Sequence, residues 1–327
     1  MVHKACWFRI LAAAAGLALA AGAAQAAPTK LYLATSQPGG GTFEIGTAFG
    51  KVISDNSGGK LEVSPSLTGG STANIRVLEK KDKDQPFRMG MTTSPAVAWG
   101  QNAKPPFKEK QRIVILSSLY PQSVVYATLK DSGIKAWKDL PGKRLAVGGR
   151  GGSIYIVTQN ALRYAGIYDK VKRELFTNPQ IVAGIQDKRL DAGMFFLTAY
   201  VPAPAFMELA RTQQGKLYFF GPDAATLKQL EEKDPGVVSD TVPVGSIPGI
   251  DYPVTSWGQM WTLIASEKMS NDIAYLVVKN MLDNWQQIEK YHPSGKHINP
   301  TNALRGVKGL KMHPGAVRYF KEKGMMK

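Results

Sequence analysis

The chain alternates short runs of β-branched, aromatic or aliphatic residues with longer stretches whose apolar residues recur at helical spacing. Residues 30–35 and 113–119 are typical of strands, whereas residues 271–288 place Ile273 and Val277 on one helical stripe. This alternation predicts an α/β protein. Because 327 residues exceed the usual size of one domain, we expect two lobes.

Glycine, serine and threonine gather in the turns between predicted strands and the helices that follow. Such turns occur at residues 39–42, 69–72, 92–94 and 148–153. In an open α/β sheet these turns lie at the carboxyl ends of the strands, where ligands bind. A helix N-terminus offers backbone N–H groups and a positive dipole end, which together suit an anion. Each turn taken alone is explained as well by helix capping, but the set predicts a shared anion site.

Other chemistries have weak support. The glycine runs match neither G-x-G-x-x-G with a later acid nor G-x-x-x-x-G-K-[ST], which argues against a nucleotide site. His292 and His297 lack the helical spacing of a metal-binding pair and indicate a solvated loop. No G-x-S-x-G elbow or Ser/His/Asp order indicates a hydrolase. We therefore expect no cofactor, no metal and no catalysis.

The first 26 residues are typical of a secretory signal peptide. Lys4 and Arg9 give a positive start, residues 10–21 form a small-apolar run, and residues 24–26 (Ala-Gln-Ala) have the form of a cleavage site. The apolar run is too short to span a bilayer. We expect cleavage near Ala26 and a periplasmic protein without membrane insertion, the alternative being an uncleaved N-terminal anchor.

Cleavage would remove the single cysteine, Cys6, and with it any disulfide or thiolate chemistry. Loss of Lys4 and Arg9 lowers the formal net charge from +16 to +14. The basic segments, such as residues 305–327, lack interleaved stacking aromatics, so we expect no nucleic-acid partner. A solvated basic surface explains this charge, as does attraction of anionic ligands or of an acidic partner.

A set of motifs runs through the mature chain in a fixed order. Residues 69–78 (GGSTANIRVL) match the pattern GGS-x-x-N-x-R-x-L, and residues 35–43 (TSQPGGGTF) form a first glycine loop. Residues 118–121, 130–144 and 313–320 supply further segments. Together these motifs resemble the TAXI solute-binding proteins, the extracytoplasmic receptors of one branch of the tripartite ATP-independent periplasmic (TRAP) transporters.

The resemblance implies a two-lobed type II periplasmic-binding-protein fold, in which each lobe is a mainly parallel sheet flanked by helices. We expect lobe 1 to comprise residues 27–122 and 255–327, and lobe 2 to comprise residues 123–254. The resemblance also implies that a small organic anion, such as a carboxylate, amino acid or dicarboxylate, binds between the lobes. The receptor, expected to be a monomer, would deliver this solute to TRAP membrane subunits.

Two segments depart from the family pattern. The loop that usually reads close to V-G-x-P-G-S-G-T is here residues 147–154 (VGGRGGSI), with Arg150 in place of proline. The segment that usually resembles D-x-G-x-x-Q-S is residues 88–94 (RMGMTTS), which lacks the acid and the glutamine. We therefore transfer no ligand identity. Arg150 either binds a ligand carboxylate through two hydrogen bonds or is a solvent-facing turn residue.

The candidate ligand-binding residues are donors from the four turns and two tyrosines near the predicted crossing between lobes. Tyr120, Tyr200 and also Phe195 are candidates to cover an apolar part of the ligand, with Trp257 as a weaker one. The predicted site comprises Gly40, Gly41, Thr42, Gly70, Ser71, Asn74, Thr93, Ser94, Tyr120, Arg150, Gly151, Gly152, Ser153 and Tyr200.

Two other functions stay open at the level of the sequence. One is an ABC-type or sensor-coupled receptor with the same fold. The other is an enzyme on that fold, as in porphobilinogen deaminase. That enzyme attaches its cofactor through a cysteine, which the mature chain lacks.

Overall fold

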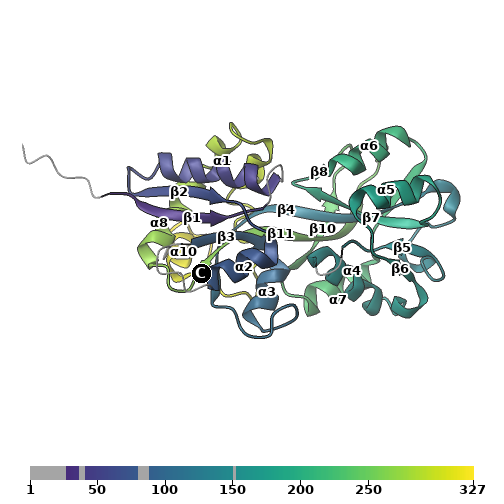
Figure 1. The fold of residues 1–327 in the computed structure, drawn as a ribbon, viewed down its shortest axis with the longest axis horizontal. Coiled ribbons are helices and arrows are strands. Elements are labelled where there is room, and N and C mark those ends of the chain that lie inside the picture. The colour runs from purple at the N-terminus through teal and green to yellow at the C-terminus, as the bar shows by residue number, and fades with distance from the viewer. Residues whose placement is uncertain (1–26, 37–40, 80–87, 150–151) are drawn as a thin grey trace, which may run out of the picture.

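Two lobes joined by long strands make up the computed structural model, which describes residues 27–36, 41–79, 88–149 and 152–327 (Figure 1). Lobe 1 contains the elements from β1 to α3 together with α8, α9 and α10, and lobe 2 contains those from β5 to α7 (Figure 1). The predicted α/β fold class is confirmed. The predicted signal peptide and the site residues Gly40, Arg150 and Gly151 lie outside the described residues.

The bounds of the elements follow the alternation expected from the sequence. The strands are β1 (Thr29–Ala34), β2 (Leu61–Ser66), β3 (Arg88–Thr93), β4 (Ile113–Leu129), β5 (Arg144–Ala146), β6 (Lys172–Glu174), β7 (Ala192–Thr198), β8 (Val201–Pro202), β9 (Leu217–Phe220), β10 (Val237–Val242) and β11 (Val254–Ser266). The α-helices are α1 (Gly41–Asp55), α2 (Ser71–Glu79), α3 (Ser94–Gln101), α4 (Ser153–Tyr164), α5 (Asn178–Gln186), α6 (Pro204–Thr212), α7 (Ala224–Lys233), α8 (Asn271–Leu282), α9 (Trp285–Ile288) and α10 (Pro314–Glu322). Short 3-10 helices are η1 (Lys130–Ser132), η2 (Trp137–Asp139), η3 (Tyr168–Lys170) and η4 (Pro293–His297).

The strands form one continuous sheet in the order β2-β1-β3-β11-β4-β7-β5-β6. In lobe 1, β1 pairs in parallel with β2 and β3, and in lobe 2, β5 pairs in parallel with β6 and β7. Strands β4 and β11 pair antiparallel with each other and join the two lobes (Figure 1). Because β3 is antiparallel to β11, which starts on the lobe 2 side, β1 and β3 run toward lobe 2. Their carboxyl ends, where the sequence places glycine-bearing turns, therefore lie on the side of lobe 1 that faces lobe 2.

Strand β4 is longer than its sequence pattern predicts. Residues 113–119 and 124–129 are expected to form two strands, but the structure has one strand from Ile113 to Leu129, buried over almost its whole length. Pro121 interrupts the apolar run without ending the strand, because β11 and β7 supply partners on its two sides. The expected lobe boundary at residues 122/123 thus lies inside a continuous strand.

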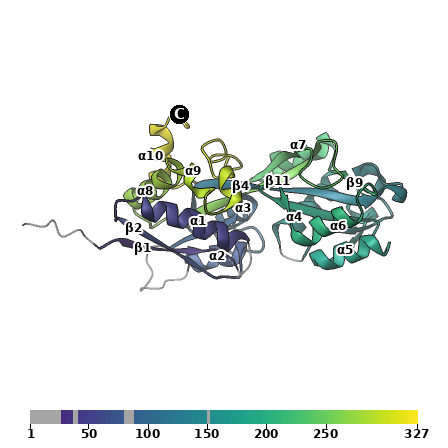
Figure 2. The ribbon, with the colours of Figure 1, turned by 90° about the horizontal axis from the view of Figure 1, so that it is seen from above.

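Two apolar clusters fill the described part of the protein. In lobe 1, Leu31, Phe49 and Phe320 belong to one of them, in which the C-terminal helices α8 and α9 return to α1 and α10 packs on α8 (Figure 2). The other cluster includes Trp137 and Phe206 of lobe 2 and extends along the joining strands to α2 and α3 of lobe 1. The C-terminal helices therefore pack on the N-terminal part of lobe 1.

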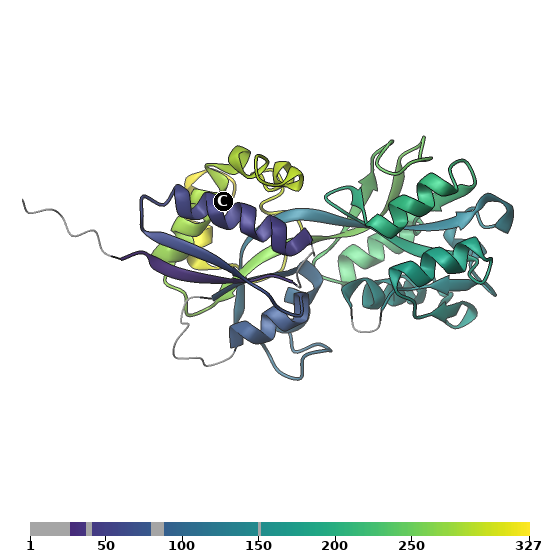
Figure 3. The same cartoon turned by 45° about the horizontal axis from the view of Figure 1, so that its top comes forward.

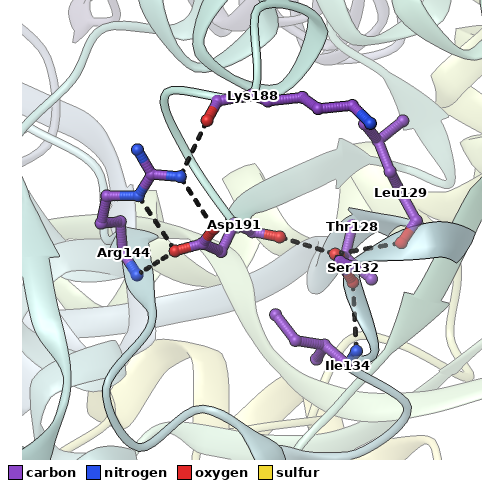
Figure 4. Close-up of polar contacts among 7 residues, drawn as sticks. All are labelled: Thr128, Leu129, Ser132, Ile134, Arg144, Lys188 and Asp191. Carbon is purple, nitrogen blue, oxygen red and sulfur yellow. Dashed lines mark hydrogen bonds and ion pairs between the residues drawn. The ribbon is translucent and has the colours of Figure 1, made fainter.

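A charged pair links Arg144, the first residue of β5, to Asp191, which directly precedes β7. The Arg144 guanidinium donates to both carboxylate oxygens of Asp191, at 2.8 and 3.0 Å, and to the Lys188 carbonyl at 2.8 Å (Figure 4). The Thr128 hydroxyl donates to the Asp191 carbonyl at 2.6 Å, which adds β4 to the junction (Figure 4). Hydrogen bonds from the Arg144 side chain lower the pKa of Asp191.

Asp191→Asn is expected to lower the free energy of unfolding by roughly 1 kcal/mol at pH 7, because a partly exposed ion pair is lost. The folded-state pKa of Asp191 is depressed, so the pair contributes fully above about pH 4 and its contribution disappears as the pH falls through that folded-state pKa. Urea unfolding from pH 7 to pH 2 should show the difference between wild type and variant shrinking. Asp187→Asn, in an exposed pair with Arg189, is the control. If the loss of unfolding free energy in Asp191→Asn did not change with pH, the prediction would be contradicted.

Candidate functional site

A cavity of about 520 Å³ lies between the two lobes. Lobe 1 and the joining strands contribute Ser36, just after β1, and residues of α1, β4, β11 and η4, and lobe 2 contributes residues of β7, β8 and α6. The described lining is Ser36, Gly41, Thr42, Ile45, Tyr120, Gln122, Phe196, Thr198, Val201, Pro202, Ala203, Pro204, Trp261, His292 and Ser294. Its volume is typical of small-molecule sites, which occur preferentially between domains.

Helix α1 directs its N-terminus at this cavity. It begins at Gly41 just beyond the carboxyl end of β1, and Figure 3 shows that end of the helix facing lobe 2. Among the described residues, nothing lies within 4 Å of where a Gly41 Cβ would be, so the backbone is accessible. Gly41 and Thr42 line the cavity, and ligand contact by them stays a prediction.

Tyr120 and Trp261 place two unused hydrogen-bond donors at the cavity. Tyr120 is fully buried, and neither its hydroxyl nor Trp261 Nε1 has a hydrogen-bond partner among the described residues. The two rings stack with centroids 6.2 Å apart. Because buried polar groups in folded proteins are nearly always paired, two orphaned donors on a cavity indicate a ligand that accepts hydrogen bonds.

The Tyr120 phenol stays protonated at neutral pH. Burial raises the pKa of Tyr120 well above its usual range, and the neighbouring Thr42 side chain opposes only part of that rise. The Thr42 hydroxyl lies near the phenol without forming a hydrogen bond of acceptable geometry. The phenol is therefore available as a neutral donor.

Two glutamine side chains are hydrogen-bonded to each other across the joining strands at the cavity. Gln259 and Gln122 are opposite residues of β11 and β4, and Gln259 Nε2 donates to Gln122 Oε1 at 2.6 Å. Gln122 Nε2 reaches the Thr198 hydroxyl of lobe 2 at 3.4 Å. The floor of the cavity is thus connected to the lobe 2 wall through side chains.

His292 lines the cavity, although the sequence pattern assigned it to a solvated loop. Its Nδ1 accepts a hydrogen bond from the Ser294 amide at 3.1 Å, which leaves Nε2 to carry the proton of the neutral ring. Burial lowers the pKa of His292, and Glu44 raises it to a smaller extent. The solvated-loop interpretation is wrong because η4 packs against α1, a contact between segments far apart in the sequence.

Three of the predicted residues, Gly41, Thr42 and Tyr120, line the cavity, and two others gather beside it. The Ser71 hydroxyl lies 2.7 Å from the Thr92 hydroxyl and accepts a hydrogen bond from the Thr93 amide at 3.2 Å. Thr93 lies directly opposite Trp261 in the sheet, so the two side chains share a face. Ligand contact by Ser71 and Thr93 stays a prediction.

Asn74 and Ser94 use their polar atoms inside the protein. Asn74 Nδ2 donates to the carbonyls of Thr35 and Met91 at 2.7 and 2.6 Å, and its Oδ1 accepts from the Thr68 hydroxyl. Ser94 donates to the Gly236 carbonyl at 2.6 Å and accepts from the Met260 amide at 3.0 Å. Both residues brace the structure around the cavity, and ligand contact by them stays a prediction.

The remaining described candidates, Gly70, Gly152, Ser153 and Tyr200, are not part of the described lining. The Gly70 carbonyl accepts a hydrogen bond from the Asn74 backbone amide at 2.8 Å. Gly152 is the N-cap of α4, and Ser153 is its first residue. The Tyr200 hydroxyl donates to Asp240 Oδ1 at 3.1 Å, and its ring contacts His297 with centroids 5.5 Å apart. Ligand contact by these residues stays a prediction.

The comparisons with known proteins agree with this architecture. A model of the NMT1-like family matches residues 33–324. The chain belongs to the NMT1-like family. A TctC solute-binding protein from Polaromonas is similar to this NMT1-like chain at 13% identity, covering 93% of this chain and 100% of that one, with a TM-score of 0.52.

XAC2383 from Xanthomonas citri is similar in the same way. Its chloride-bound structure matches at 10% identity, covering 90% of this chain and 95% of that one, with a TM-score of 0.52. Its ATP-bound structure matches at 11% identity, with coverages of 90% and 94% and the same TM-score. At these identities the likeness concerns the fold alone.

The sequence suggested Phe195 and Trp257 as aromatic residues of the site, but in this NMT1-like chain Phe196 and Trp261, on the same two strands, line the cavity. Phe195 stacks on Phe206 in the lobe 2 core at 4.2 Å, and Phe196 faces the cavity instead. Trp257 is buried and donates to the Tyr126 hydroxyl at 3.1 Å, whereas Trp261 lines the cavity. Strand alternation separates Phe195 from Phe196, but which face meets the cavity is decided by the helices packed on the sheet.

The described part of the NMT1-like chain has neither a candidate metal cluster nor a candidate membrane-spanning helix. Within it, His, Cys, Asp and Glu do not gather in any group of three or more able to hold a metal ion. Nor does any helix there have the length and apolar character needed to cross a membrane.

Proposed function

We propose that this NMT1-like protein is an extracytoplasmic receptor that captures a small organic anion between its lobes. The observation that carries the proposal is the fully buried Tyr120 hydroxyl, unpartnered on a cavity whose walls come from both lobes. The N-terminus of α1 adds a positive dipole end to the same cavity. The described lining contains neither aspartate nor glutamate, so no fixed acid there repels an anion.

Binding would be coupled to closure of the lobes about β4 and β11. A ligand that touches α1 in lobe 1 and the β7–α6 segment in lobe 2 makes more contacts when the lobes approach each other. Its differential affinity for that closed state shifts the population toward closure. The closed shape is then what a membrane partner recognises.

The membrane partner we propose is a pair of TRAP transporter subunits, which the TAXI-like motifs support. An ABC-type permease or a membrane sensor would be served by the same fold, and the TctC-like neighbour is itself a solute-binding protein. Solute uptake by vesicles carrying each class of permease, with and without this receptor, distinguishes the partners. An enzymatic role is tested by assaying the bound solute for turnover.

A thermal-shift screen of carboxylates, amino acids and dicarboxylates tests the receptor function. A solute present at about 100 times its Kd should stabilise the folded protein by roughly 2.7 kcal/mol. Stabilisation by a neutral sugar or a metal ion, with none by any anion, would contradict the proposal.

Tyr120→Phe is expected to weaken solute binding about 10-fold, equivalent to about 1.4 kcal/mol for one lost hydrogen bond. The unliganded variant should be as stable as wild type or more stable, because the hydroxyl it loses is buried and unpaired. Calorimetric titration and thermal unfolding measure the two effects.

Tyr126→Phe is the matched control, since Tyr126 is equally buried in the same strand. Its hydroxyl is paired with Thr158 at 2.9 Å and with Trp257. It should therefore lose stability and keep its affinity. The same pattern in Tyr120→Phe would show that the Tyr120 hydroxyl is structural.

A further inference from the structure

The two ends of the cavity differ in chemistry, and this difference bears on the class of solute. We infer that the solute is a monocarboxylate with an apolar body, rather than a dicarboxylate or an amino acid. This inference rests on the proposed function and narrows it. It follows from a donor end formed by Tyr120, Trp261 and the start of α1, and from an apolar wall formed by Phe196 and residues 201–204.

The donor end provides the hydrogen bonds that one carboxylate needs. Tyr120 and Trp261 each offer a single unpartnered donor, from rings that stack on each other. Accessible backbone at Gly41, on the first turn of α1, adds the dipole of a 15-residue helix. One carboxylate accepting from these groups would satisfy both orphaned donors at once.

The apolar wall offers nothing comparable to a second charged group. Pro202 and Pro204 have no backbone N–H, so α6 begins with fewer backbone donors than α1 presents at the donor end. The Thr198 hydroxyl beside this wall already accepts from Gln122 Nε2 at 3.4 Å. A second carboxylate placed against this wall would lose its hydration with no cationic side chain in the described wall to pair with, which is costly.

An amino acid is disfavoured, because its ammonium group would be desolvated without a carboxylate to balance its charge. The described lining has no carboxylate, and the nearest acid on α1, Glu44, faces His292 at 3.9 Å from Nε2. An apolar body does find a complement, since Val201 on the lobe 2 wall has 57% of its surface accessible in the unliganded protein. An apolar ligand body would cover that surface on closure.

Calorimetric titration of the full mature chain tests the inference with acids matched in size. Phenylacetate and 4-methylpentanoate represent apolar monocarboxylates, glutarate and glutamate represent the excluded classes, and phenylacetamide lacks the charge. At least one apolar acid should bind about 10-fold or more tightly than glutarate, glutamate and the amide. Tighter binding of glutarate or glutamate would overturn the inference and leave the receptor function intact. Failure of every acid to bind would contradict the receptor function as well.

Val201→Lys provides a second test at a site where folding is not at risk. Lysine in the apolar wall should weaken binding of the apolar acid about 10-fold or more and strengthen binding of glutarate, by pairing with its second carboxylate. Val244→Lys is the matched control, since Val244 is also 57% exposed and is not part of the cavity lining. It should leave both affinities and the melting temperature unchanged. Equal effects of the two substitutions, or none at Val201, would reject the apolar wall as the specificity determinant.

Discussion

Arg305→Met is expected to lower the free energy of unfolding by about 3 to 5 kcal/mol, because it leaves a carboxylate buried without its counter-ion. Asp240 is only 6% exposed, and Arg305 Nη2 donates to its Oδ1 at 2.6 Å. The other partners of this carboxylate, Ser123 and Tyr200, are neutral hydroxyls. They do not neutralise a charge that solvent hardly reaches.

Urea unfolding of three variants separates this effect from simple loss of a surface ion pair. Arg318→Met removes an exposed pair with Asp272 and should cost at most about 1 kcal/mol. Combining Arg305→Met with Asp240→Asn removes the charge as well as its partner, so much of the lost stability should return. A cost below about 1 kcal/mol for Arg305→Met alone would show that Asp240 is well solvated after all.

Gly236→Ala is expected to destabilise the fold by about 3 kcal/mol or more, from strain and overlap acting together. Gly236 has φ of +92°, which side-chain-bearing residues rarely adopt. A Cβ there would lie 2.5 Å from the Ser94 carbonyl carbon and 2.6 Å from its oxygen. Because those are backbone atoms at the start of α3, no side-chain rotation relieves the overlap. The Ser94 hydroxyl also donates a hydrogen bond to the Gly236 carbonyl at the same place.

Gly245→Ala isolates the contribution of the backbone conformation. Gly245 has φ of +80° and nothing within 4 Å of where a Cβ would lie, so alanine there should cost only about 1 kcal/mol. Chemical unfolding of both variants gives the two losses of unfolding free energy, and the difference between them is the contribution of the overlap with α3. Equal losses at the two positions would mean that the loop before β10 moves freely away from α3.

The sequence indicated the class of fold and part of the site because both depend on local pattern. Apolar spacing in α1, with Ile45, Phe49 and Val52 on one face, produces the buried face that the structure shows. The turn at Gly41 and Thr42 follows from a strand running into a helix. Tyr120, at the end of an apolar run, also proved to line the cavity.

Which side chains meet at the cavity was decided by tertiary structure. His292 and Trp261 reach Tyr120 across more than 140 residues of sequence, through packing of η4 on α1 and pairing of β11 with β4. Asn74 and Ser94 carry the hydroxyl and amide groups expected of ligand donors, yet nearby carbonyls and amides occupy them. Local pattern determines helices, strands and turns. Long-range pairing alone determines which polar atoms remain unpaired on the cavity, because a partner for each can come from anywhere in the chain.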